Sequence, residues 1–148
     1  MIIKRTAVRG LILDQENQIL LIRGQEPGSR RIFWHVPGGG VEPTEALRAA
    51  LSRELHEELG LMHAPIGAEL WEISCTFGWN ENQIDQIERY FLVRVKNFTP
   101  SAENIPSPEE QTATLEFRWW KLSEIEASPE TFFPENLAAR LKEFLAAN

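Results

Sequence analysis

The sequence contains few of the residues that crosslink a chain or anchor it in a membrane. It has one cysteine, Cys75, among 148 residues, so no disulfide bond can form within it. No apolar run approaches the roughly 20 residues that a membrane-spanning helix requires. Charges at Lys4, Arg5 and Arg9 interrupt the apolar start of the chain, which therefore has no signal-peptide h-region. We expect a cytoplasmic protein with no membrane partner.

Positive charge is also scarce. Lysine and arginine number 15 against 22 aspartates and glutamates, which gives a net charge of −7. Nucleic acids and anionic membranes would be repelled by such a chain, so we expect no long nucleic acid as a partner. A small phosphorylated substrate stays compatible with the composition, because a bound cation would invert the local field.

The rest of the composition is typical of a globular protein, with 43% hydrophobic and 25% charged residues. We expect one domain that spans residues 1–148. A long polar loop is expected over 97–114, before the last strand. Alternating and β-branched patterns predict strands, and 3.6-residue spacing predicts two helices, the first of which is capped by Thr44 and stopped by Gly60. The predicted strands are 2–13, 19–23, 32–36, 68–77, 86–95 and 115–122, and the helices are 44–59 and 135–147. Mixed strands with two separated helices indicate an α+β or α/β sandwich.

The first helix carries glutamates where its leucines point. At about 100° per residue, Glu54 and Glu58 fall on the face of the apolar residues, and Glu57 lies on its flank. Three neighbouring carboxylates repel one another, and partial burial would force them to take up protons or to find a counter-charge. Arg53 can pair with Glu57 across one turn but cannot serve all three. The alternative is a solvated acidic helix face.

A hard divalent cation would resolve this conflict. Mg²⁺ prefers oxygen ligands in an octahedron and keeps several waters. Two or three carboxylates from one helix would hold it at the protein edge, with positions open for a substrate phosphate.

The surrounding residues carry a longer signature. Gly39, five residues, Glu45, seven residues and then Arg53-Glu54-Leu55-His56-Glu57-Glu58-Leu59-Gly60-Leu61 match the Nudix box at every specified position. The chain therefore resembles a MutT-like Nudix hydrolase, with the box over residues 39–61. The resemblance implies a single α/β/α sandwich domain with a mixed central β-sheet.

The resemblance also implies a chemistry. Nudix enzymes use Mg²⁺ or Mn²⁺ to hydrolyse the pyrophosphate bond of a nucleoside diphosphate linked to another group, by attack of water on phosphorus. By the motif match, Glu57 and Glu58 are metal ligands, and Glu54 is a third ligand or the general base. A carbonyl of the glycine segment, at Gly39, is a further candidate ligand. Arg53 is expected to orient the glutamates, and Glu45 to hold the loop or pair with Arg53.

Many family members use another glutamate from a distant loop as a ligand or base. Residues 97–114 offer Glu110 and Glu109 as the preferred pair. Weaker candidates are Glu103, Glu116 and Glu88.

For the substrate we expect contacts from Arg23 and Arg31, which flank the glycine-rich segment, and from Gly39 and Gly40. Trp34 is the aromatic residue expected to stack on a base, although core packing is the alternative for it. Phe33 and Trp34 point to opposite faces of their strand, so at most one faces the site.

Two other functions fit the same fold. One is a catalytically silent Nudix module that binds a nucleotide or nucleotide sugar, although such modules usually lose box carboxylates. The other is allylic diphosphate isomerisation, which requires a cysteine-centred site that the single Cys75 fits poorly. The substrate stays open among ADP-ribose, dinucleoside polyphosphates, nucleoside triphosphates and nucleotide sugars. The sequence is compatible with a monomer or a homodimer.

Overall fold

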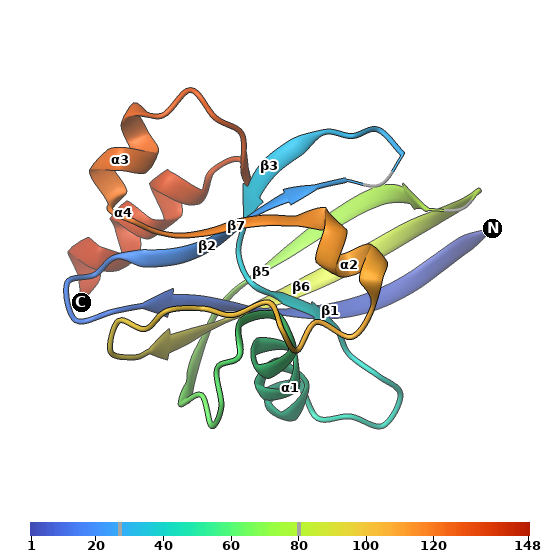
Figure 1. Cartoon of the computed structure of the whole chain (residues 1–148), viewed down its shortest axis with the longest axis horizontal. Coiled ribbons are helices and arrows are strands. Elements are labelled where there is room, and N and C mark those ends of the chain that lie inside the picture. The colour runs from blue at the N-terminus through green and yellow to red at the C-terminus, as the bar shows by residue number, and fades with distance from the viewer. Residues whose placement is uncertain (27, 80) are drawn as a thin grey trace.

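The computed structural model describes residues 1–26, 28–79 and 81–148. Within these residues, eight strands form one mixed sheet in the order β5-β6-β1-β2-β3-β8, with β4 paired to β1 and β7 paired to β2 (Figure 1). The β1–β6 and β3–β8 pairs are parallel, and the others are antiparallel. The strands are β1 Ile2–Leu13, β2 Ile19–Gln25, β3 Ile32–His35, β4 Gly38–Gly40, β5 Ile66–Trp79, β6 Asn82–Arg94, β7 Thr114–Trp120 and β8 Phe132–Phe133.

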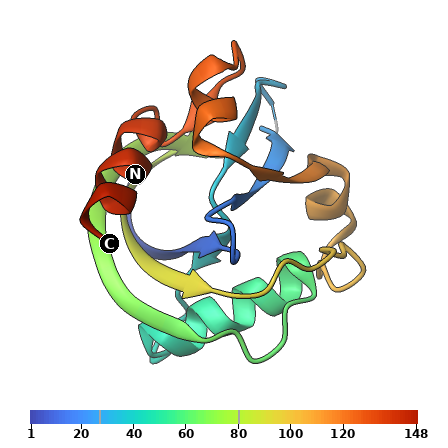
Figure 2. The same cartoon turned by 90° about the vertical axis from the view of Figure 1, so that its left-hand side faces the viewer.

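The sheet curls strongly, as the turned view in Figure 2 shows. Strands β1 and β6 pair along twelve residues, whereas the register of β1 with β2 records only Leu13 opposite Ile19. The β5-β6-β1 part and the β2-β3-β7 part therefore meet near one end and separate toward the other. Their separation leaves room for the cavity described below.

The described residues include four helices: α1 Leu47–Leu59, α2 Pro108–Ala113, α3 Leu122–Ala127 and α4 Leu137–Ala147. Helix α1 buries Leu51, Leu55 and Leu59 against one hydrophobic cluster, which includes Ile12 and Phe91. A second cluster, on the other side of the sheet, holds α3 and α4 around Trp120 and Trp34. The predicted α/β fold, with a mixed sheet between helices, is confirmed. Among the described residues, no helix has the length and apolarity needed to cross a membrane.

Helix α1 begins later than predicted. Its N-cap is Ala46, and Thr44 adopts a left-handed backbone with φ of 67° instead of capping the helix. The preceding loop is fixed by Glu45, whose carboxylate accepts a hydrogen bond from the Glu42 amide at 3.0 Å. The end is as predicted, since Gly60 has φ of 72° and closes the helix in the left-handed region that favours glycine.

The polar segment 97–114 is not loop throughout. Helix α2 begins after Ser107, whose hydroxyl accepts from the Glu110 amide at 3.1 Å, and has Pro108 in its first turn. Helix α3 was not predicted either, because its six residues bury only Ile125 and leave little periodic signal.

Candidate active site

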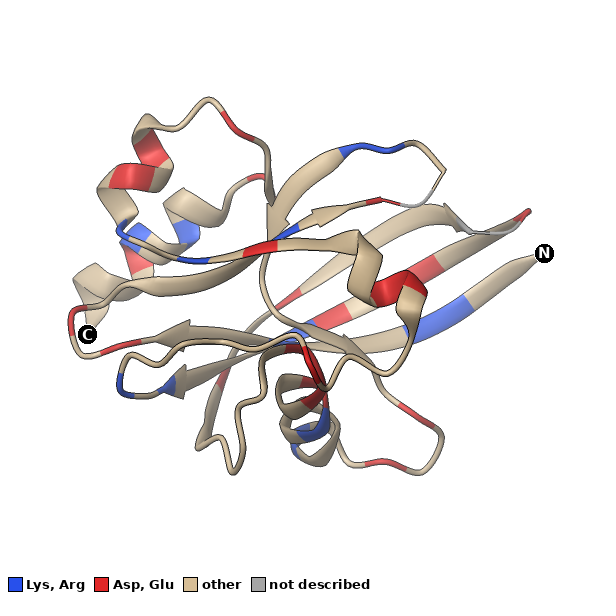
Figure 3. Cartoon of the chain, viewed as in Figure 1, with Lys and Arg blue, Asp and Glu red and all other residues tan. Residues whose placement is uncertain are grey.

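A cavity of about 630 Å³ lies where the two parts of the sheet separate. Its walls come from β1 and β4, the end of β2, strand β3, helix α1 and the segment around α2. Six glutamates line it: Glu26, Glu42, Glu54, Glu57, Glu58 and Glu110. In Figure 3, acidic residues of α1 and α2 lie on the same side of the molecule. The cavity therefore gathers negative charge from segments far apart in the sequence.

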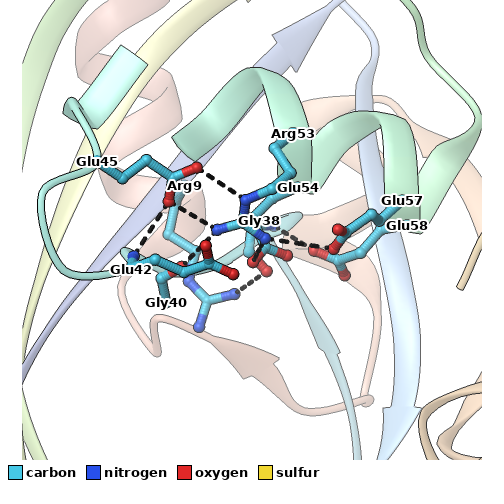
Figure 4. Close-up of polar contacts among 9 residues, drawn as sticks. All are labelled: Arg9, Gly38, Gly40, Glu42, Glu45, Arg53, Glu54, Glu57 and Glu58. Atoms are coloured by element: carbon cyan, nitrogen blue, oxygen red, sulfur yellow. Dashed lines mark hydrogen bonds and ion pairs between the residues drawn. The ribbon is translucent and has the colours of Figure 1, made fainter. Parts of the chain in front are cut away.

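The three glutamates predicted from the box, Glu54, Glu57 and Glu58, lie together on the cavity side of α1 (Figure 4). Apolar residues one position away pack into the core, so the leucines of α1 fix the face that the carboxylates present.

Arg53 organises this face. Its Nε and Nη2 donate to the two carboxylate oxygens of Glu45 at 2.8 and 2.9 Å, as the pairing prediction required. Its Nη1 donates to Glu54 at 3.0 Å and to Glu57 at 3.4 Å, and Nη2 also donates to the Gly40 carbonyl at 3.1 Å (Figure 4). The hydrogen bond from Arg53 lowers the pKa of Glu45 to about 2, so Glu45 stays ionised and anchors the guanidinium.

Arg9 organises the glycine segment from the opposite side. It donates to the carbonyls of Val36 and Gly38 at 3.3 and 3.2 Å and to the carboxylate of Glu88 at 2.8 Å. Glu88 is only 1% exposed and also accepts from Gln86 and Tyr90. Glu88 therefore holds Arg9 from within the sheet, instead of serving as the metal ligand or base for which it was a weaker candidate.

Two of the glutamates on α1 are unfavourable as free anions. Burial raises the pKa of Glu58 to about 8, with the nearby charges of Glu54 and Glu110 acting in the same direction and Arg9 opposing them. Burial also raises the pKa of Glu54. The Gly38 amide donates to Glu58 at 2.9 Å, which satisfies one oxygen only. The site has more negative charge than its own arginines neutralise, which favours a bound cation.

The glycines of β4 let side chains approach the backbone closely. A Cβ on Gly39 would lie 2.5 Å from the Glu54 carboxylate, and a Cβ on Gly38 would lie 1.9 Å from the Val8 carbonyl oxygen. Gly38 also has φ of 148°. These positions therefore require glycine for close approach.

Comparison with known proteins agrees with this geometry. The family model of the NUDIX domain matches residues 3–146. The chain belongs to the NUDIX domain family. The RNA pyrophosphohydrolase of Rickettsia prowazekii (strain Madrid E) is 29% identical over 151 residues, covering 95% of this chain and 89% of that protein.

Solved structures of NUDIX proteins share the fold. The MutT protein from Methanosarcina mazei Go1 superposes with a TM-score of 0.66 at 24% identity, over 99% of this chain and 96% of that one. The NUDIX domain of Shewanella oneidensis NrtR, solved with ADP ribose, gives 0.69 at 16% identity, over 96% and 88%. The predictions of a Nudix family member and of a pyrophosphohydrolase acting on acid anhydrides are confirmed.

Glu110, which was predicted as a ligand or base from outside the Nudix box, lies in the cavity wall of this NUDIX domain. Glu109, Glu103 and Glu116 are absent from the wall. Glu110 belongs to the first turn of α2, which Ser107 caps. The structure therefore brings one of the two preferred loop glutamates to the box.

Trp34 does not line the cavity. It is 2% exposed, packs edge-on against Trp120 with ring centroids 5.0 Å apart, and donates from its indole to Glu130 at 3.1 Å. Strand alternation turns Phe33 and His35 toward the cavity in its place. Core packing, the alternative for Trp34, is the observed outcome.

The two arginines predicted to meet the substrate also lie outside the cavity wall. Nη1 of Arg23 lies 3.9 Å from Oε1 of Glu116, and its Nε lies 4.0 Å from Oε1 of Glu130. Arg31 lies 3.5 Å from Glu26 and places its guanidinium 5.3 Å from the centre of the Phe33 ring, so it borders the cavity through residues that line it. Gly39 and Gly40, which were expected to contact the substrate, both line the cavity. Sequence reasoning missed Arg5 and Arg9 as lining residues, and it favoured Trp34 over the neighbouring His35.

A divalent cation fits the donor set, although the side chains do not converge as they stand. Among the described residues, no group of three ligand side chains is close enough to hold a metal ion. Arg53 draws Glu54 and Glu57 toward itself, and Glu58 turns to the Gly38 amide. All three nevertheless lie within five consecutive residues of one helix face, and rotation about their side-chain bonds is enough to bring carboxylate oxygens together.

Proposed function

We propose that this NUDIX protein is a divalent-metal-dependent hydrolase that cleaves the pyrophosphate bond of a nucleoside diphosphate linked to another group. One observation carries the proposal: Glu54, Glu57 and Glu58 share a cavity with Glu110, and burial raises the pKa of Glu58 to about 8. So much unneutralised carboxylate in one cavity is matched by Mg²⁺ or Mn²⁺ together with an anionic phosphate.

In this proposal Glu57 and Glu58 are the principal metal ligands, with Glu54 and the Gly39 carbonyl beside them. When bound, the cation neutralises phosphate charge and lowers the pKa of a coordinated water. Arg53 does not touch substrate. It holds Glu54 and Glu57 in place, because its own position is fixed by Glu45.

We assign the general base to Glu110. Glu54 is fixed by Arg53 and lies against Gly39, which suits a ligand. Glu110 comes from a separate wall of the cavity, and its carboxylate makes no hydrogen bond or ion pair within the part of the chain that the structure describes. Its carboxylate is therefore available to take a proton from the attacking water.

The nucleoside is assigned to the end of the cavity lined by Gln25, Phe33 and His35. The Phe33 ring offers a face for a base, and Gln25 offers an amide for hydrogen bonds. Burial, followed by the charge of Arg9, lowers the pKa of His35 to about 4, so the ring is neutral at physiological pH and suits contact with an uncharged base.

The direct test is a hydrolysis screen at slightly alkaline pH with Mg²⁺ or Mn²⁺, in which chromatography separates the nucleotide products, because cleavage of the pyrophosphate bond leaves a phosphate on each product. The panel holds ADP-ribose, diadenosine polyphosphates, nucleotide sugars and nucleoside triphosphates. An RNA oligonucleotide with a 5′-triphosphate is added, because the Rickettsia relative is named an RNA pyrophosphohydrolase. We expect turnover of a small nucleotide that falls by several orders of magnitude in Glu57→Gln and in Glu58→Gln.

The matched control is Glu103→Gln, which alters an exposed glutamate outside the cavity and should keep full turnover. Near-normal turnover in both Glu57→Gln and Glu58→Gln would contradict the metal-ligand assignment. If no substrate were cleaved while ligands still raised the melting temperature, the function would be that of a nucleotide-binding module instead.

A further inference from the structure

Three arginines line the cavity: Arg5, Arg9 and Arg53. Arg9 is committed to Glu88 and to two carbonyls, and Arg53 is committed to Glu45, Glu54 and Glu57. Across residues 1–26, 28–79 and 81–148, Arg5 makes no hydrogen bond or ion pair, although six glutamates line the same cavity. It is therefore the cavity arginine whose charge is not already used.

The position of Arg5 follows from the register of β1. Ala7 lies opposite Gly40, so Arg5, two residues before Ala7, projects from the same face of β1. A Cβ on Gly40 would lie 2.4 Å from Nη2 of Arg5 and 2.8 Å from its Nε. The guanidinium therefore lies directly over the backbone of Gly40, in space that only a glycine leaves open.

Two successive glycines of β4 lie against side chains of opposite charge. Gly39 lies against the carboxylate of Glu54, and Gly40 lies against the guanidinium of Arg5. Arg5 and Glu54 line the same cavity, so an anionic group bound there beside a cation at the α1 glutamates would have the Arg5 guanidinium as a second positive charge. A guanidinium suits this task because its planar N–H groups pair with two phosphate oxygens at once.

We propose that Arg5, seated on Gly40, is a substrate-binding residue that holds the non-bridging oxygens of the substrate's diphosphate. The proposal rests on the function proposed above and adds to it the side chain that recognises the anionic group. It also gives Gly40 a specific task, which is to leave room for the guanidinium.

The test uses the full-length protein and titration calorimetry with α,β-methylene-ADP in Mg²⁺, because this diphosphate analogue resists hydrolysis. Losing a charged, two-oxygen contact should weaken binding of the analogue about 10- to 100-fold in Arg5→Ala. Arg5→Lys, which keeps the charge but not the planar fork, should recover part of the loss. Adenosine, which lacks phosphate, should bind the variants and the wild type equally.

Lys4→Ala is the matched control. It removes one positive charge from the adjacent residue of the same strand, which is exposed and does not line the cavity. Gly40→Ala should imitate Arg5→Ala, because its methyl group displaces the guanidinium. In turnover of any substrate found above, Arg5→Ala should act mainly by raising KM.

The two proposals fail separately. Equal binding of the analogue by Arg5→Ala and Lys4→Ala would overturn the role of Arg5, whatever the wild type hydrolyses. Failure of the wild type to bind the analogue at millimolar concentration would overturn it too. A wild type that binds the analogue through Arg5 and yet hydrolyses nothing would overturn the hydrolase and leave the phosphate site standing.

Discussion

At the scale of single residues, Glu88 connects the sheet to the cavity. It accepts hydrogen bonds from Arg9, Gln86 and Tyr90, and Arg9 in turn holds the carbonyls on both sides of Pro37. Truncating one partner of a buried ion pair leaves the other charge uncompensated, which is more costly than the pair itself is stabilising. The pair thus fixes the glycine segment, but it makes the stability of the protein sensitive to mutation of either partner.

We expect Glu88→Ala to lower the free energy of unfolding by about 3–5 kcal/mol, because it leaves the Arg9 guanidinium without its counter-charge and the Gln86 and Tyr90 donors without an acceptor. Urea denaturation measures this change. Glu72→Ala, which removes an exposed carboxylate 3.7 Å from Arg89, is the comparison and should change stability by less than about 1 kcal/mol. Equal losses in the two variants would show that the Arg9–Glu88 pair is not a structural anchor.

His35 should make stability depend on pH. Burial, and then Arg9, lowers its pKa in the folded state to about 4 from an ordinary 6.5. The unfolded chain therefore binds more protons between these values, and stability is lost as the pH falls from about 6.5 to about 4. We expect His35→Gln to remove about 1–3 kcal/mol of this loss.

The measurement is the free energy of unfolding at pH 4.5 and pH 7 for the wild type and for His35→Gln. His56→Gln, an exposed histidine on α1, should keep the wild-type difference. A wild-type pH dependence that survives in His35→Gln would assign the effect to other groups.

The sequence predicts these residues unevenly. The spacing of Glu54, Glu57 and Glu58 on one helix, and the reach of Arg53, depend on local geometry that the sequence encodes directly. Arg9 and Glu88 are 79 residues apart, and their contact depends on the parallel register of β1 and β6. No local pattern reveals such a register, which is why both residues were given other roles or none.

At the scale of elements, β4 has three consecutive glycines, and two of them have different tasks. Gly38 meets the Val8 backbone and has a positive φ, whereas Gly39 meets only the carboxylate end of Glu54. A backbone atom cannot move aside, but a side chain can. The same substitution at the two positions should therefore damage different properties.

We expect Gly38→Ala to lower the free energy of unfolding by about 1–3 kcal/mol or more, through backbone strain. Gly39→Ala should retain most of the stability but lose about 10²-fold in turnover, because Glu54 is displaced from the site. Thermal unfolding and the hydrolysis assay separate the two effects. Gly78→Ala, where the nearest atom is 3.9 Å from the added Cβ, should be close to wild type in both, and a similar profile for all three variants would contradict this division.

The elements that sequence reasoning missed are short or weakly periodic. Strand β4 consists of glycines, which carry no strand propensity, and it forms because Val8 and its neighbours on β1 offer an edge. Helix α2 has six residues, none of them buried, and exists through its Ser107 cap and Pro108. Long segments such as β1 and α4 were predicted well because burial imposes a period on them.

At the scale of the whole molecule, the acidic cavity should couple cation binding to stability. A ligand that binds only the folded state adds about 2.7 kcal/mol at a concentration 100 times its dissociation constant. For a chain of this size we expect a rise in melting temperature of about 5–10 °C with saturating Mg²⁺. Differential scanning calorimetry measures it, with Glu58→Gln as the control that should respond less.

An equal rise in the wild type and in Glu58→Gln would place the cation elsewhere on this acidic protein. The net negative charge acts over the whole surface of the protein, whereas the proposed cation binds only in the cavity. Calorimetry on the wild type and on Glu58→Gln therefore distinguishes cation binding in the cavity from cation binding elsewhere on the surface.

The parallel pairing of β1 with β6 also has a consequence for the order in which the chain folds. Each of the twelve residue pairs, from Ile2 with Gln83 to Leu13 with Arg94, spans 81 positions of sequence. During synthesis the first strand must wait for its partner to be made, with its apolar residues exposed in the meantime. Arg9 and Glu88 meet only when this pairing is complete, so we expect the cavity to assemble late and the nascent N-terminal half to be the segment that chaperones protect.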